Sequence, residues 1–288
     1  MNKHLCIYHA NCTDGFGAAW TVWKALGDKC DYIPAQYGDT PPDVSLRDVI
    51  IVDFSYKKEV LAQLCQSAET VVLLDHHKTA IEDLQNFTLE YPDIKNLKLV
   101  LDQNHSGAML AWKGFHPSNP PIPLLIHYIQ DRDLWLFQLE HTKPIHAFLS
   151  SIPFDFGLWD VAASAIETDF SSIIDQGEAI LRTTRKHIDT MLKNPPTILF
   201  DAGHLTETIE IVNCPGWMAS DMGHELAKRN LFGLTYFDMK DKRVFSLRSA
   251  ENGIDVSEIA KKYGGGGHKH ASGFAIPLNH QQLFPNKI

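Results

Sequence analysis

Three features are missing from this chain of 288 residues. No apolar run approaches the roughly 20 residues that a membrane-spanning helix needs. The N-terminal residues lead straight into a predicted strand and lack the long apolar segment of a signal peptide. The five cysteines are scattered, odd in number and form no CxxC pair, which excludes a disulfide framework and fits a reducing compartment. We therefore expect a cytoplasmic protein that has no contact with membranes.

Positive charge is also scarce, since the chain has 26 Lys and Arg against 35 Asp and Glu, and its formal net charge is −9. Proteins that coat long nucleic acid are usually basic. Any nucleic-acid substrate is therefore expected to be short and held in a local pocket, and bound metal would cancel part of the acidity. The 44% hydrophobic and 21% charged residues are ordinary for a globular protein long enough for two modest domains.

The first half of the chain alternates apolar strands with helical patterns, which is typical of a parallel α/β sheet. Strands are expected over residues 5–8, 32–35, 49–52, 71–74 and 97–101. Helices are expected over residues 15–26, 57–67, 106–112 and 123–132, with Ser106 as an N-cap.

The second half begins with a mostly helical, polar stretch over about residues 161–192, which ends at Pro195-Pro196. A second alternating set follows, with strands at 209–212, 232–237, 244–248 and 273–276 and helices at 217–228 and 256–263. We therefore expect an N-terminal parallel-sheet domain over 1–165, a helical linker over 166–196, and a smaller α/β domain over 197–288.

Metal-binding residue types follow three of the N-terminal strands. His9, Cys12 and Asp14 follow the first, Asp53 follows the third, and Asp75-His76-His77 follows the fourth. Ligands usually bind at the carboxyl ends of strands in an open α/β sheet. Each group alone also fits a turn or a capping residue. Together they predict a site for one or two divalent metals.

Three further groups complete the candidate site. Asp131 and Asp133 lie on one predicted helix but point in different directions, so one is expected to be a ligand, and we favour Asp131. His105 precedes a helix, where it could bind phosphate or belong to a plain cap. The run from Gly264 to Gly267, followed by His268, suits a loop whose N–H groups surround an anion, and Arg248 suits a bidentate phosphate contact. A flexible loop is the alternative for the glycines.

These motifs, in this order and over nearly the whole chain, resemble the DHH phosphoesterase superfamily with its C-terminal DHH-associated domain. The nanoRNase, RecJ-like and exopolyphosphatase-like branch is the nearest in pattern. The resemblance implies a parallel α/β domain that binds two Mn²⁺ or Mg²⁺ ions, a second domain that holds the substrate, and a site in the cleft between them.

The resemblance also implies a role for each matching residue. His9 and Asp53 would hold one metal, and Asp14, Asp53, His76 and Asp131 the other, with Asp53 bridging. His77 would contact phosphate, Asp75 would orient the histidines or the water, and His105 would help to stabilise charge. The far end of the substrate would be bound by the following residues: Arg248, Ser249, Gly265, Gly266, Gly267 and His268.

One position departs from the family pattern. The first motif usually has two aspartates two residues apart, and the first of these is Cys12 here. A thiol in place of a carboxylate softens a metal site, so Cys12 either binds a softer ion such as Zn²⁺ or does not bind at all.

The expected activity is metal-dependent hydrolysis of phosphodiesters in short oligonucleotides or small nucleotide phosphates, by a monomer or homodimer. The enzymatic alternative is an exopolyphosphatase or pyrophosphatase, which would need more Lys and Arg in its cleft. A catalytically silent nucleotide-binding module is the alternative from another class, and Cys12 is the feature that favours it.

Overall fold

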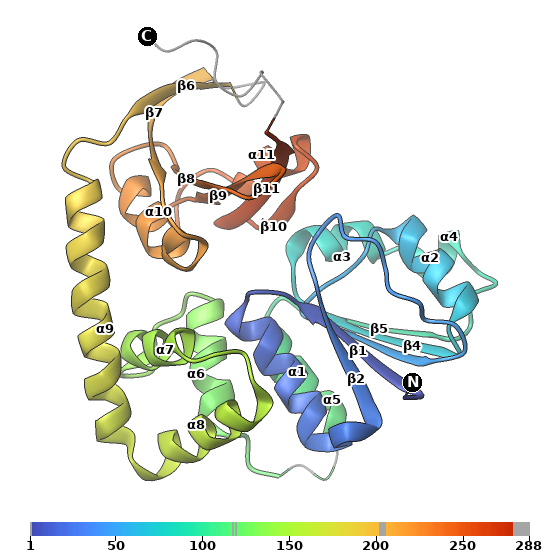
Figure 1. The fold of residues 1–288 in the computed structure, drawn as a ribbon. Helices are drawn as coiled ribbons and strands as arrows, with labels where there is room; N and C mark the ends of the chain where they lie inside the picture. The colour runs from blue at the N-terminus through green and yellow to red at the C-terminus, as the bar shows by residue number, and fades with distance from the viewer. Residues whose placement is uncertain (1, 117, 119, 202–205, 279–288) are drawn as a thin grey trace. The chain divides into compact units, whose positions relative to one another are not determined.

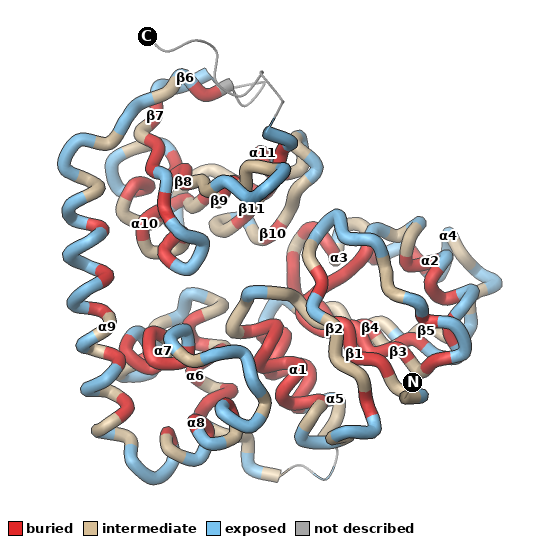
Figure 2. The backbone as a smooth tube through the Cα atoms, viewed as in Figure 1, coloured by how far each residue is buried: buried red, intermediate tan, exposed pale blue. Residues whose placement is uncertain are grey.

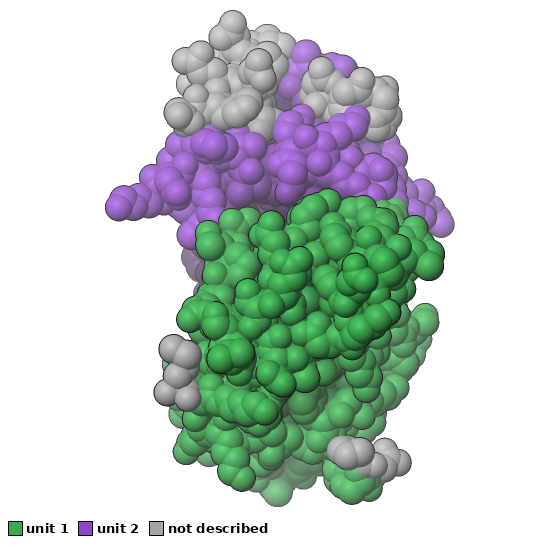
Figure 3. All heavy atoms as spheres, turned by 90° about the vertical axis from the view of Figure 1, so that its right-hand side faces the viewer, with its two compact units in different colours: residues 1–181 green, residues 182–288 purple. Residues whose placement is uncertain are grey.

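The structure is a computed structural model that describes residues 2–116, 118, 120–201 and 206–278, the side chain of residue 201 excepted. The chain forms two compact units, residues 1–181 and 182–288 (Figure 3). The boundary between the units falls inside the long helix α9 (Phe170–Met191), which occupies most of the predicted linker. The domain limits expected from the sequence stay predictions, and each unit is described by itself.

The first unit contains the predicted parallel sheet (Figure 1). Its five strands are β1 (His4–His9), β2 (Cys30–Ala35), β3 (Asp48–Val52), β4 (Thr70–Asp75) and β5 (Leu97–Leu101). They lie in the order β2-β1-β3-β4-β5, and every neighbouring pair is parallel. After β1 the chain first adds β2 on one side and then β3 on the other side of β1. Sheets of this kind bind ligands at such a switch point, here between β1 and β3.

Helices cover both faces of this sheet because its strands are apolar on both sides. Helix α1 (Thr13–Leu26), on one face of the sheet, is largely buried (Figure 2). Along β3, Val49 and Ile51 join one core cluster, and Ile50 and Val52 join the other. The second cluster packs against α1, α5 (Gly107–Phe115), α6 (Leu124–Asp133), α7 (Thr142–Ser151) and α8 (Phe156–Thr168). The first packs against α2 (Lys58–Ser67), α3 (Lys78–Leu84) and α4 (Phe87–Glu90).

The predicted strands and helices of the first unit are confirmed, and Ser106 caps α5 by accepting the Met109 N–H at 3.3 Å. Helix α7 was not expected, although it buries Ile145, Phe148 and Leu149 in the same core as α1. A short 3-10 turn, η1 (Gly27–Lys29), connects α1 to β2.

The second unit is a smaller α/β unit, as predicted. Its strands are β6 (Thr197–Asp201), β7 (Thr206–Asn213), β8 (Gly233–Asp238), β9 (Lys242–Arg248), β10 (Gly266–His268) and β11 (Ala271–Pro277). They form one sheet in the order β10-β11-β9-β8-β7-β6, in which β7 and β8 pair in parallel and the other described pairs are antiparallel. Its helices are η2 (Gly216–Met218), α10 (Ala219–Ala227) and α11 (Val256–Lys262).

The glycine run corrects one expectation, because it is not an open loop. Gly264 follows the last residue of α11 by two positions and has a φ of +76°. Its N–H donates to the Lys261 carbonyl at 3.0 Å. The next residues form β10, and a Cβ on Gly265 would lie 2.0 Å from the Gly273 carbonyl oxygen of β11. Close packing of helix, turn and strand therefore explains these glycines, and their contact with an anion stays a prediction.

Within the described residues, no helix has both the length and the apolar character needed to cross a membrane.

Candidate metal centre

The sheet brings three strand ends to one edge of the first unit. Strands β1, β3 and β4 are adjacent and parallel, so His9, Asp53 and Asp75 lie at the same end. Asp53 has a left-handed φ of +54°, which residues with side chains rarely adopt outside functional or tightly constrained positions. Gly107 of α5 packs against it so closely that a Cβ would lie 2.4 Å from the Asp53 Cβ. The backbone at this edge therefore fixes the Asp53 carboxylate.

Two groups of potential metal ligands share that carboxylate. One group is Asp14, Asp53 and His76, the other is His9, Asp53 and His77, and in each the ligand atoms lie within 4.8 Å of one another. Asp53 Oδ1 lies 3.0 Å from His76 Nε2, and its Oδ2 lies 3.4 Å from His9 Nδ1. The two oxygens of one buried side chain therefore point to two adjacent positions.

Asp133 lies in this cluster, whereas the structure does not bring Asp131, the expected ligand, into it. Asp133 Oδ2 lies 3.5 Å from His76 Nε2. Asp131 is turned away, because its carboxylate accepts the N–H groups of Gln138 at 2.8 Å and Leu139 at 3.3 Å and the hydroxyl of Thr142. Asp131 therefore holds the following loop together.

The packing of α6 explains why Asp133, and not Asp131, lies in the cluster. A Cβ on Gly17 of α1 would lie 2.7 Å from Ile129 Cδ1, so this face of α6 packs against α1. Asp133 follows Ile129 by four residues and shares its face. Asp133 therefore lies on the face of α6 that packs against α1, the helix that carries Asp14.

Several polar atoms of the cluster are buried without a hydrogen bond. Among the described residues this is true of His9 Nδ1, Asp53 Oδ2, Asp75 Oδ2 and Asp133 Oδ2. Burying such atoms without a hydrogen bond costs free energy, whereas imidazole and carboxylate groups are good ligands for divalent ions. The chemistry and orientation of these atoms therefore fit bound metal.

Protonation in the metal-free protein follows from the crowding of carboxylates around His76. Burial acts to lower the pKa of His76, but Asp133, Asp53 and Asp14 outweigh it and raise the pKa to about 10. Burial acts to raise the pKa of Asp53, but its contacts with His76 and His9 lower it well below its usual range. Burial, with the charges of Asp53 and Asp133, raises the pKa of Asp14. A proton on His76 thus partly neutralises the cluster when no metal is bound.

Asp75 positions the two histidines that follow it. Its Oδ1 accepts the backbone N–H groups of His76 at 2.7 Å and His77 at 3.2 Å, and lies 2.7 Å from His77 Nδ1. Burial acts to lower the pKa of His77, but Asp75 raises it. Asp75 is fully buried, so its effect on the cluster is to orient these rings.

Asp14 and Cys12 occupy the start of α1 with different partners. Asp14 accepts the N–H groups of Gly107 at 2.6 Å and Ala108 at 2.9 Å, which ties α1 to the start of α5. Burial and the nearby carboxylates of Asp53, Asp133 and Asp14 raise the pKa of the Cys12 thiol. Cys12 therefore lies beside the cluster as a neutral thiol in the metal-free protein.

Tyr37 is a neighbour of the cluster that the sequence did not reveal. It follows β2 in a turn, and its ring packs edge-on against His9 at 5.7 Å and His77 at 6.1 Å between centroids. The Phe54 ring packs against both Tyr37 and His9. A single aromatic residue in a turn carries no pattern that would have indicated this position.

His105 has other partners. Its Nδ1 lies 2.7 Å from Asp102 Oδ2, and its Nε2 lies 2.6 Å from Lys113 Nζ. These side chains line a depression of about 420 Å³ beside β4, β5 and α5. None of the groups of potential metal ligands found in the described residues includes His105, so its catalytic role stays a prediction.

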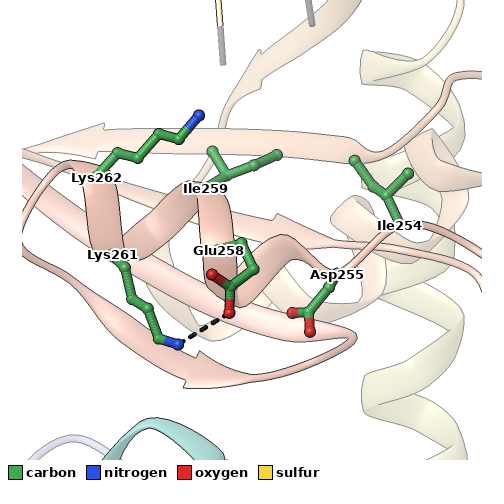
Figure 4. Close-up of a pocket in the computed structure, with 6 residues that line it drawn as sticks. All are labelled: Ile254, Asp255, Glu258, Ile259, Lys261 and Lys262. Atoms are coloured by element: carbon green, nitrogen blue, oxygen red, sulfur yellow. Dashed lines mark hydrogen bonds and ion pairs between the residues drawn. The ribbon is translucent and has the colours of Figure 1, made fainter. Parts of the chain in front are cut away.

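The predicted substrate residues of the second unit lie near the ends of β9 and β10. Arg248 donates to the Ser220 hydroxyl at 2.7 Å, and Ser249 Oγ bonds to the Ile254 carbonyl and to His270 Nδ1. A separate depression of about 590 Å³ lies along α11, with the Lys261–Glu258 ion pair of 2.9 Å at its edge (Figure 4). Its lining includes none of the predicted substrate residues, whose role stays a prediction.

Comparison with known proteins decides the family. The DHHA1 domain family matches residues 218–288. The oligoribonuclease NrnB of Bacillus subtilis (strain 168) is 28% identical over 237 residues, which are 79% of this chain and 58% of NrnB. The chain belongs to the DHH phosphoesterase superfamily.

Three further proteins are similar to this chain. The uncharacterized protein R106 of Acanthamoeba polyphaga mimivirus is 31% identical over 293 residues, which cover 94% of this chain and 67% of R106. Two solved structures align with lower identity. The pGpG-specific phosphodiesterase PggH of Vibrio cholerae is 14% identical, with 96% of this chain and 94% of PggH covered and a TM-score of 0.46. An exopolyphosphatase-related protein of Bacteroides fragilis is 13% identical, with coverages of 94% and 86% and a TM-score of 0.43.

Proposed function

We propose that this protein is a metal-dependent phosphohydrolase that cleaves phosphodiesters in short oligonucleotides or small nucleotide phosphates. The observation that carries the proposal is the pair of ligand groups that share Asp53. Membership in a phosphoesterase superfamily supports hydrolysis, and the relative NrnB is named for action on oligoribonucleotides.

His9, Asp53 and His77 would hold one divalent ion, and Asp14, Asp53, His76 and Asp133 would hold the second. Manganese is the ion we expect, because carboxylate and imidazole ligands together suit Mn²⁺, with Mg²⁺ as the alternative. Ions bound there would lower the pKa of a water molecule toward neutrality and draw charge from a phosphoryl oxygen.

The chain's own residues would orient the reactants. Asp75 accepts from His77 Nδ1, which fixes the ring and directs its other nitrogen away from Asp75. With its Nδ1 held by Asp75, His77 would bind the ion through its other nitrogen, as a neutral imidazole. Tyr37 and Phe54 cover the His9 ring and limit the access of water to it.

The proposal extends to a cytoplasmic monomer or homodimer that does not hold long nucleic acid. The net charge of −9 supports the last point, because a strongly acidic protein repels a long polyanion.

The test is hydrolysis in the presence of Mn²⁺ of a dinucleotide, a longer oligonucleotide, 3′-phosphoadenosine 5′-phosphate and polyphosphate. We expect preference for the short nucleotides, and Asp53→Asn should lower kcat/KM at least about a hundredfold, since one carboxylate serves both ligand groups. Asp160→Asn is the matched control, because Asp160 pairs with Lys24 on the surface.

Two results would contradict the proposal. Activity on polyphosphate alone would make the protein a phosphoanhydride hydrolase. No activity on any substrate, with Mn²⁺ bound, would favour a nucleotide-binding module and make Cys12→Asp the next variant to test.

A further inference from the structure

The loop between α6 and α7, residues 134–141, has an unusual backbone. Trp135, Phe137 and His141 have φ values of +59°, +50° and +67°, in the left-handed region that bulky side chains rarely adopt. Strain of this kind persists only where surrounding interactions enforce it, and it is concentrated at functional sites.

The interactions that enforce this conformation come from Asp131. Its carbonyl oxygen accepts the N–H groups of Leu136 at 2.9 Å and Phe137 at 3.3 Å. Its carboxylate accepts the N–H groups of Gln138 and Leu139, as described above. One buried residue thus fixes four consecutive amides, and the loop is a defined structure.

The loop displays aromatic rings beside cations. The Arg132 guanidinium lies 4.2 Å from the Trp135 ring centroid, and Lys143 Nζ lies 5.0 Å from that of Phe137. The two rings pack edge to face at 4.9 Å. Trp135 nevertheless keeps 36% of its surface exposed.

The position of the loop connects it to the metal centre. Asp133, whose Oδ2 lies 3.5 Å from His76 Nε2, precedes Trp135 by two residues. Consecutive Cα atoms are about 3.8 Å apart, so the Trp135 Cα lies within about 8 Å of the Asp133 Cα. A partly exposed aromatic residue with a cation against its ring therefore follows a proposed metal ligand by two residues, within the same unit.

We propose that Trp135, supported by Phe137 and Arg132, is a stacking surface for a nucleobase of the substrate at the metal centre. This inference rests on the proposed function and specifies its substrate class. Aromatic faces stack on any base, whereas polyphosphate offers no π surface. Lys143 and Arg132 add positive charge where the sugar–phosphate chain would lie. The expected ligand is a nucleotide with at least one base next to the scissile phosphate, without strict base preference.

The test compares Trp135→Leu with Trp135→Phe. Both replacements are apolar, and the chain already places a leucine, Leu46, at a φ of +58°, so both are expected to fold. Thermal unfolding checks this point. With Mn²⁺ and a dinucleotide, Trp135→Leu should raise KM roughly tenfold with little change in kcat, whereas Trp135→Phe should stay near wild type. A dinucleotide analogue whose bases are replaced by hydrogen should show no difference among the three proteins.

Leu158→Ala, at an exposed position of α8, is the control for loss of surface apolar area. Equal effects of Trp135→Leu on the normal and base-free substrates would overturn the inference, as would equal KM values for the Leu and Phe variants. If the wild type hydrolyses none of the substrates, the proposed function fails on its own. Equilibrium binding of a labelled dinucleotide then tests the stacking surface: a tenfold weaker Kd for Trp135→Leu supports it, and an unchanged Kd overturns it.

Discussion

At the scale of single residues, Asp131 and Asp133 are two carboxylates on one helix with different expected roles. Asp133→Asn should lower the affinity for Mn²⁺ and reduce kcat/KM roughly a hundredfold, with little effect on folding. Asp131→Ala should instead lower the free energy of unfolding by about 3 kcal/mol, because three donors lose their acceptor. Calorimetric metal titration and urea unfolding of both variants separate the two effects. Equal loss of metal affinity in both would contradict this assignment.

His76 makes the properties of the cluster depend on pH. Burial opposes its charge, but Asp133, Asp53 and Asp14 raise its pKa from 6.5 to about 10. This raised pKa stabilises the metal-free protein fully below pH 6.5, and the contribution is lost as the pH rises toward 10. Metal affinity should change in the opposite direction, rising about tenfold per pH unit, because binding displaces this proton.

Urea unfolding in EDTA and Mn²⁺ titration at several pH values between 6.5 and 8.5 measure both slopes. His76→Gln should remove the decline in stability, and His187→Gln, at an exposed position of α9, should keep it. A wild type whose Mn²⁺ affinity is constant over this range would contradict the assignment.

The sequence identified most residues of the cluster for a simple reason. Each follows a strand whose apolar run is unmistakable, and parallel strands place their carboxyl ends together. The choice between Asp131 and Asp133 needed the orientation of α6 about its own axis. That orientation comes from packing, such as the contact of Ile129 with α1, which spacing alone does not specify.

At the scale of elements, the contact between the start of α5 and the end of β3 governs the metal centre. A Cβ on Gly107 would lie 2.4 Å from the Asp53 Cβ, so Gly107→Ala must displace Asp53 or shift the helix. We expect destabilisation of about 1–3 kcal/mol and weaker Mn²⁺ binding.

Gly114→Ala is the matched control in the same helix. Its Cβ would meet only Leu74 Cδ1, at 3.4 Å, so this variant should be neutral or more stable by up to about 1 kcal/mol. Thermal unfolding and Mn²⁺ titration of both variants check the prediction, and unchanged metal affinity in Gly107→Ala would show that Asp53 has room to move.

Elements without a distinctive local pattern were the ones that the sequence missed. The run of four glycines suggested a loop, but Gly265 is required by the close approach of Gly273, a contact between segments that lie apart in the chain. Helix α7 buries Ile145 and Phe148, yet the residue before it, His141, is in the left-handed conformation and makes no capping hydrogen bond with its side chain. Its start is determined by the preceding loop, which Asp131 holds.

At the scale of the whole molecule, all the ligand groups assigned to metal above come from the first unit. The second unit has apolar cores of its own, one around Phe232 and Phe245 and one around Met222 and Leu226. Local opening of each unit is therefore expected to depend mainly on its own contacts.

Metal should consequently stabilise the two units unequally. Binding at a hundred times the Kd adds about 2.7 kcal/mol to any opening that releases the ion. Hydrogen exchange with and without Mn²⁺ should show slower exchange at the ends of β1, β3 and β4 and the start of α5, with β8, β9 and β11 unchanged. Asp53→Asn should abolish the difference, because both ligand groups contain Asp53. Equal protection across residues 206–278 would mean that the units open together, so that stability gained at the metal centre is shared by the entire chain.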